Sequence, residues 1–351
     1  MQIDFHHTVT YVTARLAGFK KKEADKIAYA AQYVDDATSP GTVVFKNKAA
    51  YNRMCSAHKM IDVRNVNLAE NQHVWMPFHF LPGNGGLEAG QNPDGSFIEK
   101  IVSRPGNDNP IAQDMVEEAI REKKRPYGLH RLGITMHVFA DTWAHQQFAG
   151  VEHPINEVEN AHETGGTKVF SGGLKGWLYD VLDDAVPSLG HGRANVFPDM
   201  PFLTWAYTNG FGKDIARHNT DDFCEAAEQM CLAMQRFQDS ANVGMPTRDA
   251  EKMKDLFSSI QEKKGEARHK QWLTEIADGA FSFGPETIEY SGKDGKKSWK
   301  KQALGTSCDK PVYPYKTSFL KSDWKLFHDA VQAHHLYVNH QLLPKYGICA
   351  T

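Results

Sequence analysis

Two histidines and an aspartate recur at four-residue intervals within one apolar segment of the chain. They are His137, Asp141 and His145, in the stretch 132–145. At about 100° per residue, these side chains fall within an arc of about 80° on one face of a helix. Most of the surrounding residues are apolar, so much of this helix must be buried, and burying three ionisable groups without a cation is costly. The segment therefore predicts a site for a divalent cation, and Asp141 could bridge two of them.

Other ionisable residues stand in apolar surroundings earlier in the chain. His6 and His7 open the first expected helix, and Asp35 and Asp36 end the second. Acidic residues at the C-terminal end of a helix oppose its dipole, which a nearby cation would offset. His79 stands among seven apolar residues, where a histidine is either hydrogen-bonded within the core or a ligand. One helix rarely completes a metal site, so these residues are candidates to complete it.

The order of these residues resembles that of the zinc-dependent phospholipase C and S1/P1 nuclease superfamily. The shared order, over roughly residues 4–160, is a leading histidine, an acid after a second helix, a His-Phe pair before Pro-Gly, and a helical His-x-x-x-Asp. Members of that superfamily are helical enzymes that cleave phosphate esters with a cluster of zinc ions. A nearer likeness is to an uncharacterised bacterial family with an Asp-x-His opening, a Gln-x-Val-Asp-Asp motif and an Ala-Asp-Thr-Trp-x-His motif.

The superfamily resemblance implies a set of metal ligands. They are His6 or His7, Asp35 or Asp36, His79, His137 and a bridging Asp141, with His145 as the next zinc histidine. The superfamily also uses a His-x-x-x-Glu pair, whose spacing His153 and Glu157 share. His191 and Asp199 compete with that pair for the second metal site, since glycines flank His191 and Asp199 lies in an aromatic setting.

One departure from the superfamily affects the number of metals. In those enzymes the amino group of an N-terminal tryptophan binds a zinc ion, whereas this chain starts with Met1. Either the histidines near the start replace that ligand or one metal is absent, so two metals are as well supported as three. The histidine and carboxylate ligands suit zinc, and manganese or iron would also be accommodated.

This ligand set predicts hydrolysis of a phosphate ester. Neighbouring divalent cations bind the ester, acidify a water molecule and offset charge on the leaving oxygen. Asp141 would set the metal spacing, and Asp36 is the candidate to orient the water. The expected substrate is a small or lipid phosphate ester, with nucleic acid a less favoured one. The alternatives are a metal-stabilised scaffold or binding protein without catalysis, and an HD-type phosphohydrolase, for which His328-Asp329 is the only His-Asp pair.

The elements that must position these residues are mostly helices. Apolar periodicity predicts a mainly α chain that forms one domain over residues 1–351, with long loops at 40–110 and 150–210 and the phospholipase C/P1 nuclease type of fold. The C-terminal part, 285–351, is expected to hold a small β-hairpin near 287–300 and a final helix that packs on the domain. Helices are expected at 5–16, 21–34, 111–124, 127–148, 213–240, 247–264, 267–279 and 322–344.

Composition narrows the class of protein further. The 351 residues are 41% hydrophobic and 24% charged, with a formal net charge of −3, which disfavours a broad nucleic-acid-binding face. No apolar run is long enough to span a membrane, and no signal peptide is visible, so we expect a soluble cytoplasmic protein. The odd number of cysteines, five, fits a reducing compartment. The seventeen histidines direct attention to metal binding.

Overall fold

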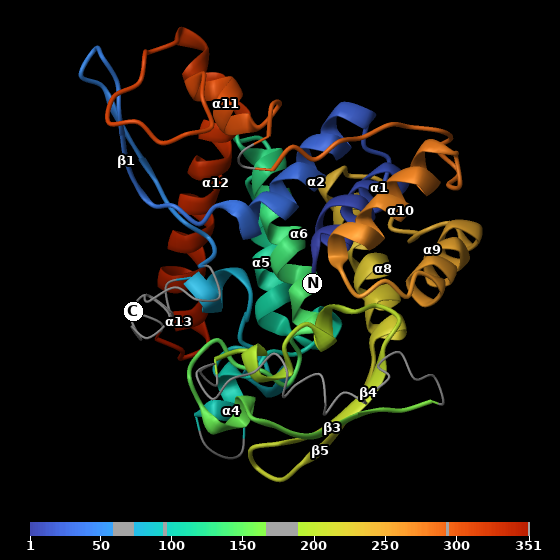
Figure 1. The fold of residues 1–351 in the computed structure, drawn as a ribbon. Coiled ribbons are helices and arrows are strands. Elements are labelled where there is room, and N and C mark those ends of the chain that lie inside the picture. The colour runs from blue at the N-terminus through green and yellow to red at the C-terminus, as the bar shows by residue number, and fades with distance from the viewer. Residues whose placement is uncertain (59–73, 94–96, 166–188, 293–294, 350–351) are drawn as a thin grey trace.

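The computed structural model describes residues 1–58, 74–93, 97–165, 189–292 and 295–349 (Figure 1). Helices dominate it, so the prediction of a mainly α protein is confirmed. The longer helices are α1 (Thr10–Leu16), α2 (Lys21–Asp36), α5 (Pro110–Arg121), α6 (Gly128–Ala144), α8 (Asn219–Phe237), α9 (Thr247–Ser259), α10 (Gly265–Ala277) and α12 (Asp323–Tyr337). The shorter helical segments are η1 (Asp4–Val9), η3 (Asn84–Gly86), α4 (Ile98–Ile101), η4 (Gly106–Asp108), η5 (Pro154–Asn156), η6 (Gly192–Ala194), η7 (Phe197–Asp199), α11 (Trp299–Leu304), η8 (Thr317–Lys321), η9 (Val338–Leu342) and α13 (Leu343–Lys345).

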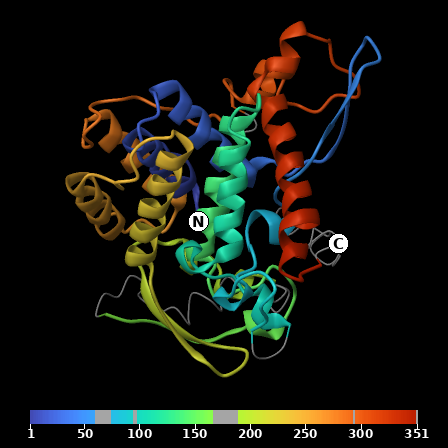
Figure 2. The same ribbon diagram turned by 180° about the vertical axis from the view of Figure 1, so that it is seen from behind.

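Helix α6 runs through the middle of the molecule, with α8 on one side and α12 on the other (Figure 2). Nearly all its residues are buried, because apolar side chains continue around the helix instead of forming one stripe. Helix α2 packs closely on it at Gly133, where a Cβ atom would lie 2.4 Å from the carbonyl oxygen of Ile27. The glycine therefore lets the two helices approach, which brings the end of α2 beside the polar face of α6.

Strands form two small antiparallel sheets. The strands β1 (Gly41–Val44) and β2 (Ala50–Arg53) make a hairpin in which Val43 lies opposite Tyr51. The second sheet has the order β3-β4-β5, from β3 (Val158–Glu163), β4 (Thr204–Asn209) and β5 (Asp214–His218). Both sheets fall in or next to the two regions for which the sequence predicts long loops.

The β-hairpin predicted near 287–300 is wrong for the described residues of that segment, which form no strand pairing. The alternating pattern has another cause, since this part of the chain lies extended along the helices. The Tyr290 hydroxyl donates to Asp36, and the Tyr29 hydroxyl donates to the carbonyl oxygen of Gly292. Ser298 then caps α11 by accepting from the backbone N–H of Lys301.

Several predicted helix boundaries also need correction. The predicted helix at 213–240 begins with strand β5, and α8 starts only at Asn219. The first predicted helix, 5–16, is divided into η1, which is π-helical, and α1. The final helix does begin as predicted, because Ser322 caps α12 by accepting from the backbone N–H of Lys325, and it continues through η9 into α13.

The buried apolar residues form three clusters. The largest lies among α1, α5, α6, α8, α9 and α10, and the second joins α2, α11, α12 and β1. Helix α6 contributes to both, for example through Met136 to the first and Ile134 to the second. The third cluster lies around the β3-β4-β5 sheet and includes Trp205. Among the described residues, no helix has both the length and the apolar character needed to cross a membrane.

Candidate metal centre

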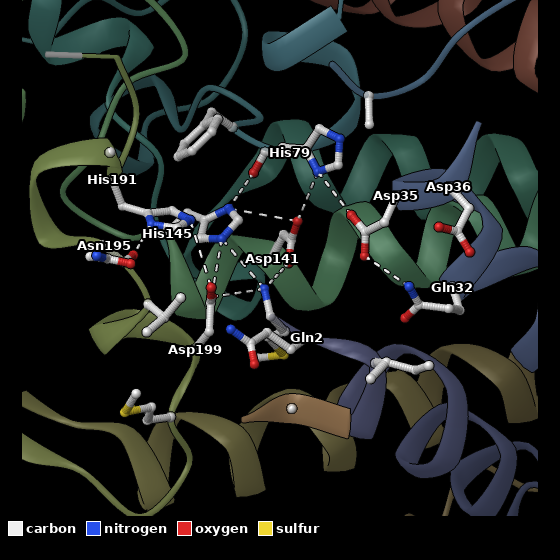
Figure 3. Close-up of a pocket in the computed structure, with 18 of the residues that line it drawn as sticks. Gln2, Gln32, Asp35, Asp36, His79, Asp141, His145, His191, Asn195 and Asp199 are labelled. Atoms are coloured by element: carbon white, nitrogen blue, oxygen red, sulfur yellow. Dashed lines mark hydrogen bonds and ion pairs between the residues drawn. The ribbon is translucent and has the colours of Figure 1, made fainter. Parts of the chain in front are cut away.

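Histidines and aspartates from distant parts of the chain converge beside the C-terminal half of α6 (Figure 3). They come from η1, the end of α2, the residue after the helical turn 74–78, α6 with its C-cap, and the two short helices η6 and η7. Among the described residues, three groups have donor atoms within 4.8 Å of one another and could hold a metal ion. These groups are His6, Asp35 and His137; His79, His137 and Asp141; and His145, His191 and Asp199.

The predicted face of α6 is confirmed by the structure. His137 and Asp141 lie within α6, and His145 is its C-cap, whose backbone N–H donates to the carbonyl oxygen of Asp141. All three side chains are buried, and Asp141 Oδ2 lies 3.3 Å from His137 Nε2 and 3.6 Å from His145 Nδ1. One turn of helix between successive residues therefore places the three groups side by side.

His79, His137 and Asp141 form a donor triangle of the size that a metal ion requires. His137 Nε2 lies 3.2 Å from His79 Nδ1 and 3.3 Å from Asp141 Oδ2, and His79 Nδ1 lies 3.4 Å from Asp141 Oδ2. Two nitrogen or oxygen ligands at about 2.0–2.1 Å from a tetrahedral zinc ion lie about 3.3 Å from each other. The three atoms therefore fit three corners of such a tetrahedron.

His6 and Asp35 adjoin this triangle. The ring of His6 stacks on that of His137 with 3.8 Å between centroids, and His6 Nε2 lies 3.2 Å from Asp141 Oδ1. Asp35 Oδ1 lies 3.8 Å from His137 Nε2 and 3.9 Å from His79 Nδ1. The Asp35 side chain is 34% exposed, which makes it the most accessible carboxylate of the three metal groups.

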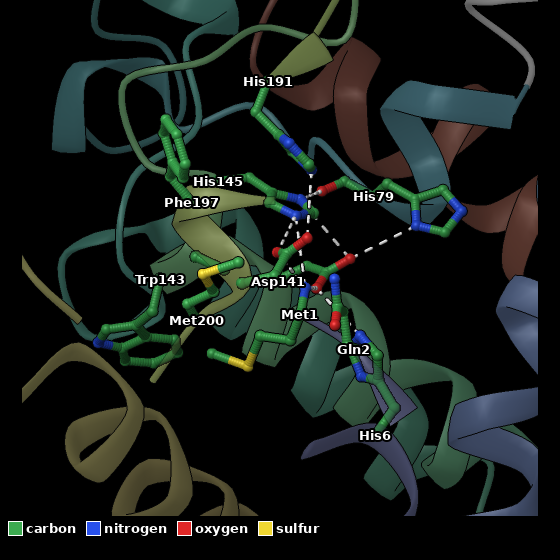
Figure 4. A network of polar contacts seen from close by, with 12 residues as sticks. Met1, Gln2, His6, His79, Asp141, Trp143, His145, His191, Phe197 and Met200 are labelled. Carbon is green, nitrogen blue, oxygen red and sulfur yellow. Dashed lines mark hydrogen bonds and ion pairs between the residues drawn. The ribbon is translucent and has the colours of Figure 1, made fainter. Parts of the chain in front are cut away.

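A second donor group surrounds the amino nitrogen of Met1 (Figure 4). That nitrogen lies 2.6 Å from Asp141 Oδ1, 3.1 Å from Asp199 Oδ1 and 3.4 Å from His145 Nε2. His145 Nε2 is 3.6 Å from Asp199 Oδ1, and His191 Nε2 is 3.9 Å from Asp199 Oδ2. Asp141 therefore faces the first triangle with one oxygen and this second group with the other.

Backbone carbonyls fix the tautomers of three of the histidines. His79 Nε2 donates to the carbonyl oxygen of Ser56, and His145 Nδ1 donates to the carbonyl oxygen of His79. His191 Nδ1 donates to the carbonyl oxygen of Asn195. Because a carbonyl oxygen only accepts hydrogen bonds, each of these ring nitrogens must carry the proton. The remaining nitrogen of each ring is then a lone-pair donor, and it is the one that faces the cluster. Histidines that bind metals are commonly oriented in this way.

Burial and charge set the ionisation of the cluster. Burial lowers the pKa of His6, His137 and His145 to about 4, so these imidazoles are neutral at pH 7. Burial alone would raise the pKa of Asp141 and Asp199, but the neighbouring histidines and the Met1 amino group hold both well below the usual range. Neutral imidazoles beside ionised carboxylates are the forms that bind metal ions.

The buried polar atoms of the cluster also point to a cation. Within the described part of the chain, His6 Nδ1, His137 Nδ1 and Asp141 Oδ2 have no hydrogen-bonding partner. A buried ionised oxygen without a hydrogen bond is costly, and a bound cation would remove that cost for Asp141. The residues of the cluster therefore fit a metal ion in donor type, separation and ionisation.

A cavity of about 810 Å³ opens onto the cluster. Its polar lining includes Asp35, His79, Asp141, His145, His191 and Asp199. Trp75 and Phe80 add aromatic surface, and Lys263 and Lys264 line it just before α10. The metal-binding groups therefore face a space large enough for a small organic ligand.

Two predicted site residues lie apart from the cluster. His7 points away from it, and its Nδ1 lies 2.9 Å from His269 Nε2. Asp36 lines the cavity, but its Oδ2 accepts from the Tyr290 hydroxyl at 2.5 Å, and it belongs to none of the three metal groups. The choice between His6 and His7 therefore falls to His6, and that between Asp35 and Asp36 falls to Asp35.

The competing pairs are separated in the same way. His153 accepts from the backbone N–H of Ile155, and Glu157 lies 3.6 Å from Arg193, so neither joins the cluster, whereas His191 and Asp199 do. His328 is buried against aromatic rings, and Asp329 bonds to Tyr51 and Lys325. Among the described residues, this His-Asp pair lies in none of the metal groups. It therefore gives no support to an HD-type phosphohydrolase.

Sequence reasoning missed three contributors to the cluster. One is the Met1 amino group, which lies beside Asp141, although the sequence predicts that nearby histidines replace an N-terminal ligand or that one metal is absent. Gln32, within the Gln-x-Val-Asp-Asp motif, donates to Asp35 Oδ2 at 3.3 Å. Arg268 on α10 is fully buried and binds both Asp4 and the carbonyl oxygen of Asp199. In the sequence, the sign of this last role is a basic residue at the helical spacing of Trp272 and Ile276, which are buried.

Comparison with known proteins identifies one related group. A family model described as a family of unknown function (DUF6765) matches residues 1–342. No curated protein and no solved structure matches the chain. The matched range contains every donor of the metal centre, from His6 to Asp199.

Proposed function

We propose that this chain, which belongs to the DUF6765 family of unknown function, is a metal-dependent phosphoesterase. One observation carries the proposal. The group of His79, His137 and Asp141 and the group of His145, His191 and Asp199 lie on the two sides of Asp141, whose Oδ1 is 2.6 Å from the Met1 amino nitrogen, and both groups face a cavity of about 810 Å³. Neighbouring cations joined by a carboxylate are the arrangement that suits displacement at a phosphate ester.

The metal ions in this proposal are two zinc ions, with room for a third. The first is assigned to His79, His137 and Asp141, and the second to His145, His191 and Asp199. His6 and Asp35 are the donors that remain for a third ion, since His137 Nε2 is already assigned to the first. Imidazole and carboxylate ligands without thiolate suit zinc, while manganese and iron remain the alternatives that metal analysis must distinguish.

The number of donors favours a catalytic site over a structural one. Structural zinc ions are enclosed by four protein ligands, whereas catalytic ones keep a position for water or substrate. The group of His79, His137 and Asp141 supplies three donors, and His79 and Asp141 line the cavity. A metal ion there would keep a coordination position toward the cavity.

The chain's own residues suggest how such a site would act. Bound divalent cations would supply Lewis acidity toward the phosphate and lower the pKa of a water molecule. Asp35 is exposed to the cavity, and Gln32 holds its Oδ2, so Oδ1 is placed to accept a proton from that water. On the sequence alone, Asp36 is the candidate residue that orients the water, and the proposal gives this role to Asp35 instead. Lys263 and Lys264 add positive charge that attracts an anionic ester.

The superfamily resemblance supports the same proposal. The helical His137-x-x-x-Asp141 motif, His79 and the acid at the end of α2 meet at one place, as the zinc ligands of the phospholipase C and P1 nuclease superfamily would. In that superfamily the amino group of the first residue binds zinc, and here the Met1 amino nitrogen lies within 3.4 Å of His145 Nε2. We therefore also propose that the chain has the helical fold of the phospholipase C and P1 nuclease type.

The test is a substrate panel on protein of known metal content. Wild type, Asp141→Asn and the exposed control Asp278→Asn would be analysed for zinc, manganese and iron. Each would then be assayed on p-nitrophenyl phosphate esters, phosphatidylcholine, and single-stranded DNA and RNA. We expect two or three metal ions per chain, hydrolysis of at least one ester that EDTA abolishes, and a loss of more than about 100-fold in Asp141→Asn alone.

Two outcomes would contradict the proposal. Protein without bound metal, even after incubation with zinc or manganese, would remove the metal centre. Metal-loaded wild type that leaves every substrate intact would instead favour the metal-stabilised scaffold. Unchanged activity in Asp278→Asn shows that any loss in Asp141→Asn comes from the site and not from removing a negative charge.

A further inference from the structure

The β1–β2 hairpin and a later segment form a projection at one end of the molecule (Figure 1). We call residues 41–53 and 308–321 the hairpin lobe. The two parts are joined by a parallel bridge between Phe45 and Tyr313. Beneath it, the Phe319 ring lies 4.8 Å from the ring of Phe45 and 5.5 Å from that of Tyr51. The bridge and the aromatic contacts therefore hold the two parts of the lobe together.

The lobe is strongly basic in a chain that is slightly acidic. It contains six basic residues and one acidic residue, Asp309, a formal charge of +5, while the whole chain carries −3. Arg53 lies 2.7 Å from Asp309, and Lys300 of the adjoining α11 lies 3.0 Å from the same carboxylate. The only acidic charge of the lobe is thus already paired. The basic residues other than Arg53 are Lys46, Lys48, Lys310, Lys316 and Lys321.

These five lysines are exposed, and none forms an ion pair within the described part of the chain. Exposed large apolar side chains occur among them. Val44, Val312 and Leu320 are 36%, 43% and 56% exposed, which is three of the seven such side chains in the described residues. Because Phe45 and Tyr313 face inward, Val44 and Val312 lie on the outward face of the bridged strands.

We propose that the hairpin lobe binds the surface of a membrane that contains anionic lipids. Lysine side chains around a small aliphatic patch suit this partner. Their ammonium groups would pair with lipid phosphates, while valine and leucine side chains enter the boundary of the acyl region. The lobe contains none of the metal donors, so this proposal stands apart from the phosphoesterase activity.

Two features favour a membrane over nucleic acid. The unpaired cations of the lobe are all lysines, whereas nucleic-acid contacts draw heavily on arginine, and Arg53 is paired with Asp309. Single-stranded nucleic acid also stacks on exposed aromatic rings. In the lobe these rings are buried or half-buried against one another, as with Phe45 and Tyr315 at 5.4 Å between centroids.

The test is co-sedimentation of the full chain with vesicles. Vesicles of phosphatidylcholine alone would be compared with vesicles that contain 30% phosphatidylserine. The lobe variant is Lys46→Gln, Lys48→Gln, Lys316→Gln and Lys321→Gln together. Its matched control, Lys22→Gln, Lys124→Gln, Lys213→Gln and Lys270→Gln, changes the net charge equally at exposed lysines outside the lobe.

We expect wild type and the control to bind phosphatidylserine vesicles, and the lobe variant to bind about tenfold or more weakly. Val312→Ser with Leu320→Ser should weaken the binding that remains at high salt. Asp141→Asn should bind vesicles like wild type, which separates this proposal from the catalytic one. Wild type that ignores the vesicles, or equal losses in both lysine variants, would overturn the proposal. So would lobe-dependent binding of single-stranded RNA without vesicle binding.

Discussion

Asp141 is the residue at which the two donor groups meet. Its Oδ2 lies 3.3 Å from His137 Nε2, while its Oδ1 lies 2.6 Å from the Met1 amino nitrogen. A carboxylate with one oxygen on each side sets the separation of two cations, and it must be ionised to do so. The neighbouring histidines and amino group hold the pKa of Asp141 well below its usual range despite burial, so that condition is met at neutral pH.

The two neighbouring acids at the end of α2 should differ in their effect on the metal centre. Asp35→Asn removes the carboxylate that faces His79 and His137, so we expect a lower metal content or at least about a tenfold loss of hydrolysis. Asp36→Asn weakens the bond from the Tyr290 hydroxyl and should cost about 1 kcal/mol of stability while the metal content stays unchanged. Metal analysis and urea unfolding of both variants measure this. Loss of metal in Asp36→Asn but not in Asp35→Asn would mean that Asp36, and not Asp35, is the metal ligand.

The metal-free protein should lose stability as the pH falls from 7 to 4.5. Burial holds the pKa of His6, His137 and His145 near 4, against 6.5 for an unperturbed histidine. In this window the unfolded chain takes up protons that the folded chain does not, so the free energy of unfolding decreases with acid, by on the order of 2 kcal/mol per histidine. Urea unfolding at several pH values in the presence of EDTA measures it. A flat profile would mean that these imidazoles take up protons equally in the folded and the unfolded chain.

At the scale of elements, the start of the chain is held against α10. Arg268, fully buried on α10, lies 2.5 Å from Asp4 Oδ2, 3.0 Å from Gln2 Oε1 and 3.1 Å from the carbonyl oxygen of Asp199. One guanidinium therefore joins the first residues of the chain to η7. Asp199 of η7 is a donor of the second metal group, and the first residues place the Met1 amino group beside it, so α10 positions that group without contributing a ligand.

We therefore expect Arg268→Lys to affect the two metal groups unequally. Lysine keeps the charge but cannot bond to all three acceptors in the plane of the guanidinium. The metal content should fall by about one ion per chain, since the group of His79, His137 and Asp141 is held by α6 instead. A cobalt-substituted sample would show the loss of one set of absorption bands, with Lys270→Arg as the control on the same helix. Loss of all metal, or of none, would contradict this positioning role.

At the scale of the whole molecule, the candidate metal centre brings together segments that span residues 1–199. Its donors come from η1, the end of α2, His79, α6 with its C-cap, the N-cap of η6, and η7. Buried carboxylates and imidazoles are thereby concentrated in one place, where without a cation they repel or remain unsatisfied. Folding and metal binding should therefore be coupled through the whole of this half of the chain.

Removal of metal should lower the midpoint of thermal unfolding of the whole chain. A ligand at 100 times its Kd stabilises the folded state by about 2.7 kcal/mol, which corresponds to a shift of about 4 °C for a chain of this length. Scanning calorimetry with and without EDTA measures the shift, and added zinc should reverse it. Asp141→Asn, which has lost the bridging carboxylate, should respond to EDTA much less. Identical midpoints for metal-loaded and metal-free wild type would contradict the coupling.

Local patterns in the sequence determine most of the helices and the central face of the site. His137, Asp141 and His145 share a face because helical periodicity depends only on neighbours within a turn or two. The same rule locates α2, α5 and the start of α12. It misreads residues 287–292, because the alternation of apolar residues there reflects packing along α1 and α2 and not strand pairing.

Only the tertiary structure decides which neighbour of each pair enters the site. Asp35 and Asp36 differ by about 100° around α2, and the close approach of α2 to α6 at Gly133 turns Asp35 toward His137 and leaves Asp36 to Tyr290. His191 and Asp199 join the cluster through loop and sheet contacts that no local pattern encodes. The position of the Met1 amino group depends on Arg268, more than 260 residues away in the chain. Such long-range contacts have no period in the sequence, and so the packed chain alone determines them.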